Sequence, residues 1–411
     1  MPNDFKKLML ARLLFTFAVQ MQAVVLGWKM YDLLGDPLAL GLVGLTEAIP
    51  AIGLALYAGH IVDRSRPLIV YRRVLLVSLT SALMILLSQF YLSDLGTMGQ
   101  VYALYASSFL TEVARSFSQP SMFSAVPRII PRHQIPISSA WMSSAVQTGR
   151  IVGPALGGIM FGFAGLKMTA LAICLLLVSS IIAMSLISVL KMEPQKRDPS
   201  TIQVKDHFLS GAKFVFRHPL LLPALSLDMF SVLFGGVVAL LPIYCKEILL
   251  VGPKGLGLLR AAPSIGAISM SLFLTRWRYQ HKAGSYLLKA VTGFGLCILV
   301  FSVSQNFILS FVALALSGAF DSVSMVVRTS IVQMFSPDDM RGRISSVNSM
   351  FIGSSNEIGE FESGVTAKLM GVVPAAVFGS VMCLVTVGIV AVLSPTLRKM
   401  NLAEVAASQS S

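Results

Sequence analysis

The chain has 411 residues, of which 55% are hydrophobic and only 12% are charged. A soluble globular domain carries about 25% charged residues, so this composition excludes a soluble fold and indicates a polytopic membrane protein. The formal net charge is +13, but the Lys and Arg residues fall in alternate loops instead of forming one basic surface. We therefore exclude nucleic acid as a partner and expect the lipid bilayer to surround the protein.

Apolar runs of about 20 residues, the length that crosses a bilayer, recur along the whole chain. They predict an all-α membrane protein with twelve transmembrane helices. The expected spans cover residues 9–31, 39–62, 68–91, 99–126, 137–163, 167–190, 220–244, 255–275, 285–304, 307–334, 344–370 and 373–393. The first span is too long for a signal peptide, so we expect it to be retained. Basic residues alternate between loops, and the positive-inside rule then places both termini in the cytoplasm.

One long polar break divides the chain into two halves. The sequence predicts a six-helix bundle at 1–190, a cytoplasmic linker at 191–219, a second six-helix bundle at 220–393 and a cytoplasmic tail at 394–411. Within the linker, residues 208–216 are amphipathic and predict a short helix on the membrane surface.

The two halves resemble each other. A shift of 213 residues brings Gly44, Pro50 and Gly53 onto Gly257, Pro263 and Gly266, and a shift of 206 brings Gly153 onto Gly359 and Arg115 onto Asp321. A parallel repeat of this kind predicts two pseudo-symmetric bundles related by an axis along the membrane normal. Substrate is then expected at their interface, near the midplane.

Residues 148–158 form a motif inside the fifth expected span, and they read T-G-R-I-V-G-P-A-L-G-G. Gly149, Gly153 and Gly157 recur every four residues, so on a helix they form one smooth stripe that a second helix can approach closely. Pro154 removes a backbone donor and is expected to bend the helix. A lone G-x-x-x-G pattern indicates only helix packing, but the full string, which ends in Gly158, is far more specific.

This string resembles the fifth-helix antiporter motif of major facilitator superfamily exporters. The loop after the second span adds to the resemblance, because Gly59, Asp63 and Arg64 match the G-x-x-x-D-R signature of that superfamily. The resemblance implies that these residues and the glycine motif act in gating. The alternative for the loop is a solvated basic turn that only sets topology. The second glycine of the signature is missing, and Arg66 stands near its place.

Further strings around Pro120, Pro131 and Pro337 make the whole chain similar to the drug:proton antiporter branch that includes macrolide and enterobactin exporters. The resemblance implies a secondary active transporter in the bacterial inner membrane, working by alternating access. It implies export of a drug, macrolide or siderophore-like small molecule in exchange for protons. We expect a monomer with no cofactor and no metal.

Ionisable residues within membrane spans are functional candidates, because a buried charge is costly in a bilayer. The proton-coupling candidates are Asp228, Glu112 and Glu357. The candidates for the substrate cavity are Gln20, Gln22, Glu47, Arg115, Arg150, Asp321 and Arg328.

Several of these assignments have alternatives. Asp228 has no basic neighbour in the sequence, so desolvation is expected to favour its protonated form; a structural carboxyl pair is the alternative. Arg115 can pair with Asp321 in the other half. Alternatively, Arg115 pairs with Glu112 one turn away, and Asp321 stays protonated or meets Arg328 about two turns on. Gln20 and Gln22 of the first span are expected either to contact substrate or to form hydrogen bonds with neighbouring helices.

Two other functions are weighed against proton-coupled export. A lysophospholipid or lipid flippase of the same fold is the first, and the antiporter motif argues against it. A membrane-embedded transferase is the second. The five histidines lie at the cytoplasmic side or in loops, and no metalloprotease, P-loop or zinc-binding pattern is present. We therefore do not expect an enzyme.

Overall fold

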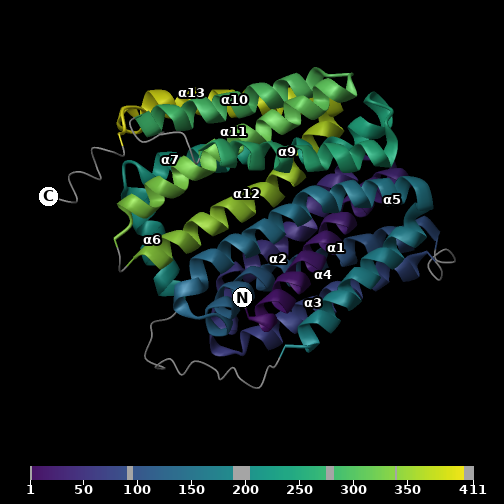
Figure 1. Ribbon diagram of the computed structural model, residues 1–411. Helices are drawn as coiled ribbons and strands as arrows, with labels where there is room; N and C mark the ends of the chain where they lie inside the picture. Colours follow the sequence, from purple (N-terminus) through teal and green to yellow (C-terminus); the bar gives the residue numbers. More distant parts are fainter. Residues whose placement is uncertain (1, 90–95, 188–203, 275–281, 338–339, 402–411) are drawn as a thin grey trace. The chain divides into compact units, whose positions relative to one another are not determined.

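The computed structural model describes residues 2–89, 96–187, 204–274, 282–337 and 340–401 (Figure 1). In these residues the chain forms helices joined by short turns, and no strand is present. The long helices are α1 (Asn3–Leu34), α2 (Pro37–Arg64), α3 (Pro67–Ser88), α4 (Gly96–Ile129), α5 (Ile135–Ser185), α7 (Leu221–Phe234), α9 (Gly252–Leu274), α10 (Ala283–Val303), α11 (Phe307–Phe335), α12 (Arg341–Met370) and α13 (Val372–Leu393). Shorter helices are α6 (Val204–Arg217), α8 (Leu241–Ile243) and α14 (Pro395–Arg398).

The predicted all-α membrane fold is confirmed. Among the described residues, nine helical stretches are long and apolar enough to cross a membrane. The helices α4 and α12 are also long enough, at 34 and 30 residues, but their polar and charged side chains lower their hydropathy. Such residues face the interior of a helical bundle more often than lipid.

The fifth and sixth expected spans form one continuous element, α5, of 51 residues. Its only non-helical residue is Gly165, with φ 74° and ψ −179°. This backbone conformation is open to glycine and strained for other residues. Gly165 therefore separates the two spans with a turn of a single residue.

The seventh expected span is not continuous. The helix α7 ends at Phe234, and the chain continues through a 3₁₀ turn at Val237–Leu240, α8 and a π-helical turn at Tyr244–Ile248. Two glycines mark the break because neighbouring atoms leave no room for side chains. A Cβ on Gly235 would lie 2.7 Å from the Phe294 ring, and one on Gly236 would lie 2.6 Å from the carbonyl oxygen of Gly359.

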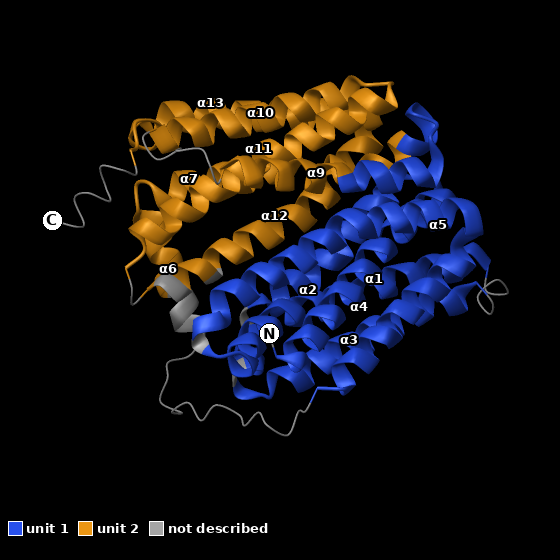
Figure 2. Ribbon diagram, in the orientation of Figure 1, with its two compact units in different colours: residues 1–201, 245–261 blue, residues 202–244, 262–411 orange. Residues whose placement is uncertain are grey.

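The chain forms two compact units (Figure 2). Unit 1 contains residues 1–201 and 245–261, and unit 2 contains residues 202–244 and 262–411. The stretch 245–261, which includes the start of α9, groups with unit 1, although the sequence places it in the second half. The predicted domain boundaries remain a prediction.

Each unit has its own apolar core. In unit 1 the largest buried side chains come from α1, α3 and α5, and they include Phe5, Leu8, Tyr71, Leu75, Ile173 and Leu177. In unit 2 the core is formed by α7, α10 and α11, with Leu221, Leu227, Leu287, Val327 and Ile331. The helix expected within the linker is α6, which contacts α12 where Arg343 Nη1 donates to Ser210 Oγ at 3.1 Å. Its position on the membrane surface remains a prediction.

Candidate functional site

The glycine stripe of α5 is the place where α1 comes closest. A Cβ on Gly149 would lie 2.5 Å from Thr16 Cγ2, and one on Gly153 would lie 2.7 Å from Gln20 Cβ. A Cβ on Gly157 would lie 2.8 Å from Met21 Cα. The two backbones are therefore so close that only hydrogen atoms fit between them along the stripe.

The same motif continues onto a second partner within unit 1. A Cβ on Gly158 would lie 2.7 Å from Gly257 Cα at the start of α9. Lys254, one turn before Gly257, holds its Nζ 3.2 Å from the centre of the Phe163 ring. The start of α9 is thus held to α5 by a glycine contact and a cation–π contact. Pro154 is buried inside the helix beside this crossing.

Lys246 and Glu247 also join the stretch before α9 to α1. Lys246 Nζ donates to Asp32 Oδ1 at 2.9 Å, and the Tyr31 hydroxyl donates to Glu247. These contacts lie at the end of α1, where it meets α2. They attach residues 245–261 to unit 1 by side chains as well as by backbone packing.

Three charged residues meet in the middle of unit 1. Arg115 Nη1 lies 2.6 Å from Glu112 Oε2, one turn away on α4, and 3.8 Å from Glu47 Oε2 on α2. Ser108 Oγ donates to the other oxygen of Glu47 at 2.6 Å. Arg115 therefore pairs within its own unit, which is the local alternative from the sequence. Its side chain is still 45% exposed.

The two glutamines of α1 have different surroundings. Gln22 is buried, and its Nε2 lies 2.8 Å from Ser81 Oγ, 3.0 Å from Ser107 Oγ and 2.8 Å from Thr111 Oγ1. This network joins α1 to α3 and α4, so Gln22 bonds across helices. Gln20 is half-buried beside the glycine stripe.

Asp228 has no basic neighbour in the sequence, but the fold gives it one. Asp228 of α7 forms an ion pair with Arg328 of α11, and their side chains are 7% and 4% exposed. The two residues are far apart in the sequence, and only the packing of α7 on α11 brings them together. A pair buried this deeply requires mutual compensation, because each charge alone is costly in an apolar environment.

Asp321 lies close to this ion pair. A small cavity in unit 2 is lined by Asp228, Ser231, Val232, Val291, Phe294, Asp321 and Ser324. Two of the sequence-derived candidates, one assigned to coupling and one to substrate, therefore share one cavity. The cavity lies between α7, α10 and α11.

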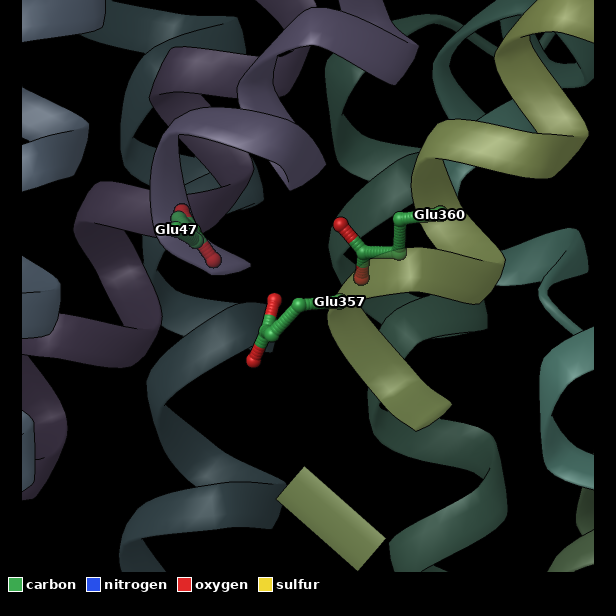
Figure 3. A group of neighbouring side chains, drawn as sticks. All are labelled: Glu47, Glu357 and Glu360. Carbon is green, nitrogen blue, oxygen red and sulfur yellow. The ribbon is translucent and has the colours of Figure 1, made fainter. Parts of the chain in front are cut away.

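Glu357 and Glu360 are neighbours on α12, one turn apart (Figure 3). Glu357 is buried and Glu360 is half-buried. Figure 3 also labels Glu47, which belongs to α2 of unit 1 and interacts there with Arg115 and Ser108. Arg150 of α5 lies one residue from the glycine stripe, and its side chain is exposed.

The loop motif lies at the end of α2. Gly59 is part of the helix, and a Cβ there would meet no atom within 4 Å. Arg64 is exposed and is the last residue of α2. The side chain of Asp63 lies outside the described residues. Ser65 and Arg66 are both extended, so α3 starts without the second glycine of the superfamily signature.

The whole chain matches one protein family, described as transmembrane secretion effectors, over residues 2–411. The chain belongs to this family of the major facilitator superfamily.

Related transporters agree with this assignment. The enterobactin exporter EntS of Salmonella typhi is 22% identical over 278 residues, which are 67% of this chain and 66% of that protein. EntS of Escherichia coli O1:K1 / APEC is 24% identical over 246 residues, which are 60% of this chain and 58% of that protein. The matched region is thus less than two thirds of each relative's length.

Solved structures share the fold. A bacterial homologue of the iron transporter ferroportin in its inward-facing state has a TM-score of 0.74 at 15% identity, covering 97% of this chain and 99% of that chain. A POT family transporter in complex with 5-aminolevulinic acid has a TM-score of 0.75 at 12% identity, covering 97% of both chains. The chain is thus a multi-pass membrane transporter of the major facilitator type.

One buried charge, Arg12, was not among the candidates from the sequence. Arg12 of α1 is 8% exposed; it donates to Ser118 Oγ and, at 2.9 Å, to Gln119 Oε1. It also lies over the Phe15 ring, 5.6 Å from its centre. Its position inside the first expected span was the available signal. An arginine there is as exceptional as Arg150 in the fifth.

Proposed function

We propose that this transporter exports a small molecule in exchange for protons by alternating access. The observation that carries the proposal is the group of ionisable side chains that α7 and α11 bury inside unit 2. Asp228 and Arg328 are almost fully buried, and Asp321 lines the same cavity. Such groups are costly to keep within a membrane, and they therefore mark candidate functional sites. A carboxylate that gains and loses a proton suits that role.

Two further observations support export as the direction of transport. Enterobactin exporters are among the relatives that match the chain. The glycine motif of α5, which resembles the antiporter motif, packs tightly on α1 and on the start of α9. We infer a substrate of the drug, macrolide or siderophore class, a place in the bacterial inner membrane with both termini in the cytoplasm, and a monomeric protein.

Transport by the purified full-length protein in proteoliposomes tests this function. Enterobactin, a macrolide and a cationic dye serve as probes, and an imposed pH gradient supplies the driving force. We expect at least one probe to move against its gradient, and Asp228→Asn to reduce that movement. Lys167→Gln, a change at a surface lysine outside the cavity, is the control and is expected to transport normally.

Two results would contradict proton-coupled export. If the probe moves equally well after a protonophore and an ionophore remove both the pH gradient and the potential, proton coupling is rejected. Movement of a fluorescent lysophospholipid under the same conditions, with no transport of the three probes, favours the flippase instead.

A further inference from the structure

The cavity of unit 2 contains more negative charge than its ion pair neutralises. Asp228 and Arg328 compensate each other. Asp321 lines the same cavity, and it makes no hydrogen bond or ion pair with the described part of the chain. If all three side chains are charged, the cavity carries one net negative charge among apolar helices. A proton on Asp321 removes that charge at little cost.

The cavity is polar on one side and has room for about one water molecule. Ser231 and Ser324 line it together with the two carboxylates. The Ser324 hydroxyl is buried and has no hydrogen-bond partner among the described residues. A water molecule in this space would form hydrogen bonds with a carboxyl group and a hydroxyl. It would then be the partner with which Asp321 exchanges its proton.

Arg328 lies on the same face of α11 as Asp321. It lies seven residues after Asp321 on α11, which is two turns or about 10 Å along the same helix face. Its long side chain covers much of that distance. Its Nε, moreover, has no hydrogen-bond partner among the described residues. Arg328 therefore has donors to spare while it is paired with Asp228.

Other charged groups near α11 lie outside the cavity lining. Residues 262–274 of α9 carry no charged side chain, and α10 carries Tyr286 and Lys289. The described charged side chains of α12 are Arg343, Glu357, Glu360, Glu362 and Lys368. None of these residues lines the cavity. Among the described residues of unit 2, Asp228 is thus the charged group that shares the cavity lining with Asp321, and Arg328 is the ion-pair partner of Asp228.

We propose that Asp321 carries the coupling proton and that Arg328 moves between the two carboxylates. Arg328 pairs with Asp228 while Asp321 is protonated. When Asp321 releases its proton, Arg328 leaves Asp228 and pairs with the Asp321 carboxylate. The unpaired Asp228 carboxylate attracts Arg328 back once Asp321 is protonated again. The proposal rests on the proton-coupled export proposed above. It assigns the exchangeable proton to Asp321, whereas the sequence favoured Asp228.

Infrared difference spectroscopy of the full-length protein in lipid nanodiscs tests the assignment without any substrate. The C=O stretching band of a protonated carboxylic acid is followed as the pH rises. Asp321→Asn should remove one titrating component. Asp228→Asn should keep it and move its midpoint to lower pH, because Arg328 then pairs only with Asp321. We expect a shift of about one pH unit, which is tenfold in proton affinity.

Two more variants complete the test. Arg328→Gln should move the midpoint to higher pH, because Asp321 loses its counter-charge. Glu362→Gln, a carboxyl on α12 outside the cavity, is the matched control and should leave the cavity component unchanged. If Asp228→Asn removes the component and Asp321→Asn keeps it, Asp228 is the carrier and the proposal is wrong. A spectrum in which neither variant changes anything also overturns it.

The test remains decisive if Asp321→Asn does not fold, because the shift or loss of the component in Asp228→Asn distinguishes the two carriers by itself. It is also independent of transport. Proton-driven transport without a titrating Asp321 rejects this assignment alone. A titrating Asp321 in a protein whose transport ignores the proton gradient rejects the proposed function instead.

Discussion

Gly153 lies where α5 and α1 are in backbone contact, and even one extra carbon would lie 2.7 Å from Gln20 Cβ. We expect Gly153→Leu to force the helices apart at a cost of about 1–3 kcal/mol, the usual range for overpacking. Protein should still reach the membrane, with a lower melting temperature and transport lost or uncoupled. Detergent-solubilised thermal unfolding and the proteoliposome assay measure the two effects.

Gly388 of α13 provides the matched control for this change. A Cβ there would meet no atom within 4 Å, so Gly388→Leu should leave both stability and transport close to normal. If Gly153→Leu behaves like Gly388→Leu, the contact between α5 and α1 is not needed for function.

Gln22 holds three helices together through hydroxyl groups. Replacing it by Leu removes its bonds to Ser81, Ser107 and Thr111 but leaves these hydroxyls bonded to one another, since Ser81 Oγ lies 2.9 Å from Ser107 Oγ and 2.8 Å from Thr111 Oγ1. We therefore expect a modest loss of stability, about 0.6 kcal/mol for each interhelical bond. The melting temperature should fall while the KM of the transported probe stays the same.

Gln20→Leu is the comparison for this prediction, because Gln20 is also on α1 but is only half-buried. A raised KM with unchanged stability in Gln22→Leu would show that Gln22 contacts substrate and not its neighbouring helices.

At the scale of elements, His218 joins α6 to α7. Its Nδ1 accepts hydrogen bonds from the backbone N–H groups of Leu220 and Leu221, both at 3.3 Å. Its ring lies 5.5 Å from those of Phe214 and Phe335. Burial lowers the pKa of His218, so folding favours the neutral ring that can accept these bonds.

This arrangement predicts acid-sensitive stability. Since the pKa of His218 is lower in the folded than in the unfolded protein, its contribution to stability is fully present above the unfolded value of about 6.5. It is lost as the pH falls from there through the lower pKa of the folded state. The melting temperature of the wild-type protein should fall on acidification, and His218→Gln should reduce this dependence. His133→Gln, at an exposed histidine, should not. Equal acid sensitivity in all three proteins would contradict the role of His218.

The sequence predicted the positions of the helices better than the points at which they are interrupted. Hydropathy located α9, α10, α11 and α13 closely, because each is one uninterrupted apolar run in the sequence. It did not locate the end of α7 at Phe234, since Gly235 and Gly236 lie inside an apolar run that looks continuous. The reason for that break is spatial: Gly359 and Phe294 occupy the space where side chains would be.

The same limit applies to the candidate site. The sequence identified Asp228, Asp321 and Arg328 as buried charges, because charges are rare within apolar spans. It could not pair Asp228 with Arg328, since that contact depends on how α7 packs against α11. It passed over Arg12, whose partners Ser118 and Gln119 lie far away on α4.

At the scale of the whole molecule, equivalent residues of the two sequence halves play similar parts within their own units. Gly153 lies against α1, and its counterpart Gly359 lies against α7, where a Cβ would be 2.6 Å from the Leu233 carbonyl oxygen. Pro50 of α2 accepts a hydrogen bond from Ser116 of α4 at 3.5 Å, and its counterpart Pro263 lies against Gly318 of α11. The repeat is thus visible in packing as well as in sequence.

Although the packing repeats, the buried charges differ between the units. In unit 1, Arg115 pairs with two glutamates. In unit 2, Arg328 pairs with Asp228, and Asp321 lines the adjacent cavity. The shift of 206 residues places Asp321 opposite Arg115 in the alignment, so the charge is reversed between the halves.

The central claim, proton-coupled export, is tested most directly by measuring proton movement that substrate alone drives. Proteoliposomes containing the full-length protein and an internal pH indicator receive an outward or inward gradient of the transported probe, with no initial pH difference. We expect protons to move in the direction opposite to the probe, so that efflux of the probe lowers the internal pH and influx raises it. Neither change should occur in Asp321→Asn. Probe flux at an unchanged rate with no change of internal pH would contradict it.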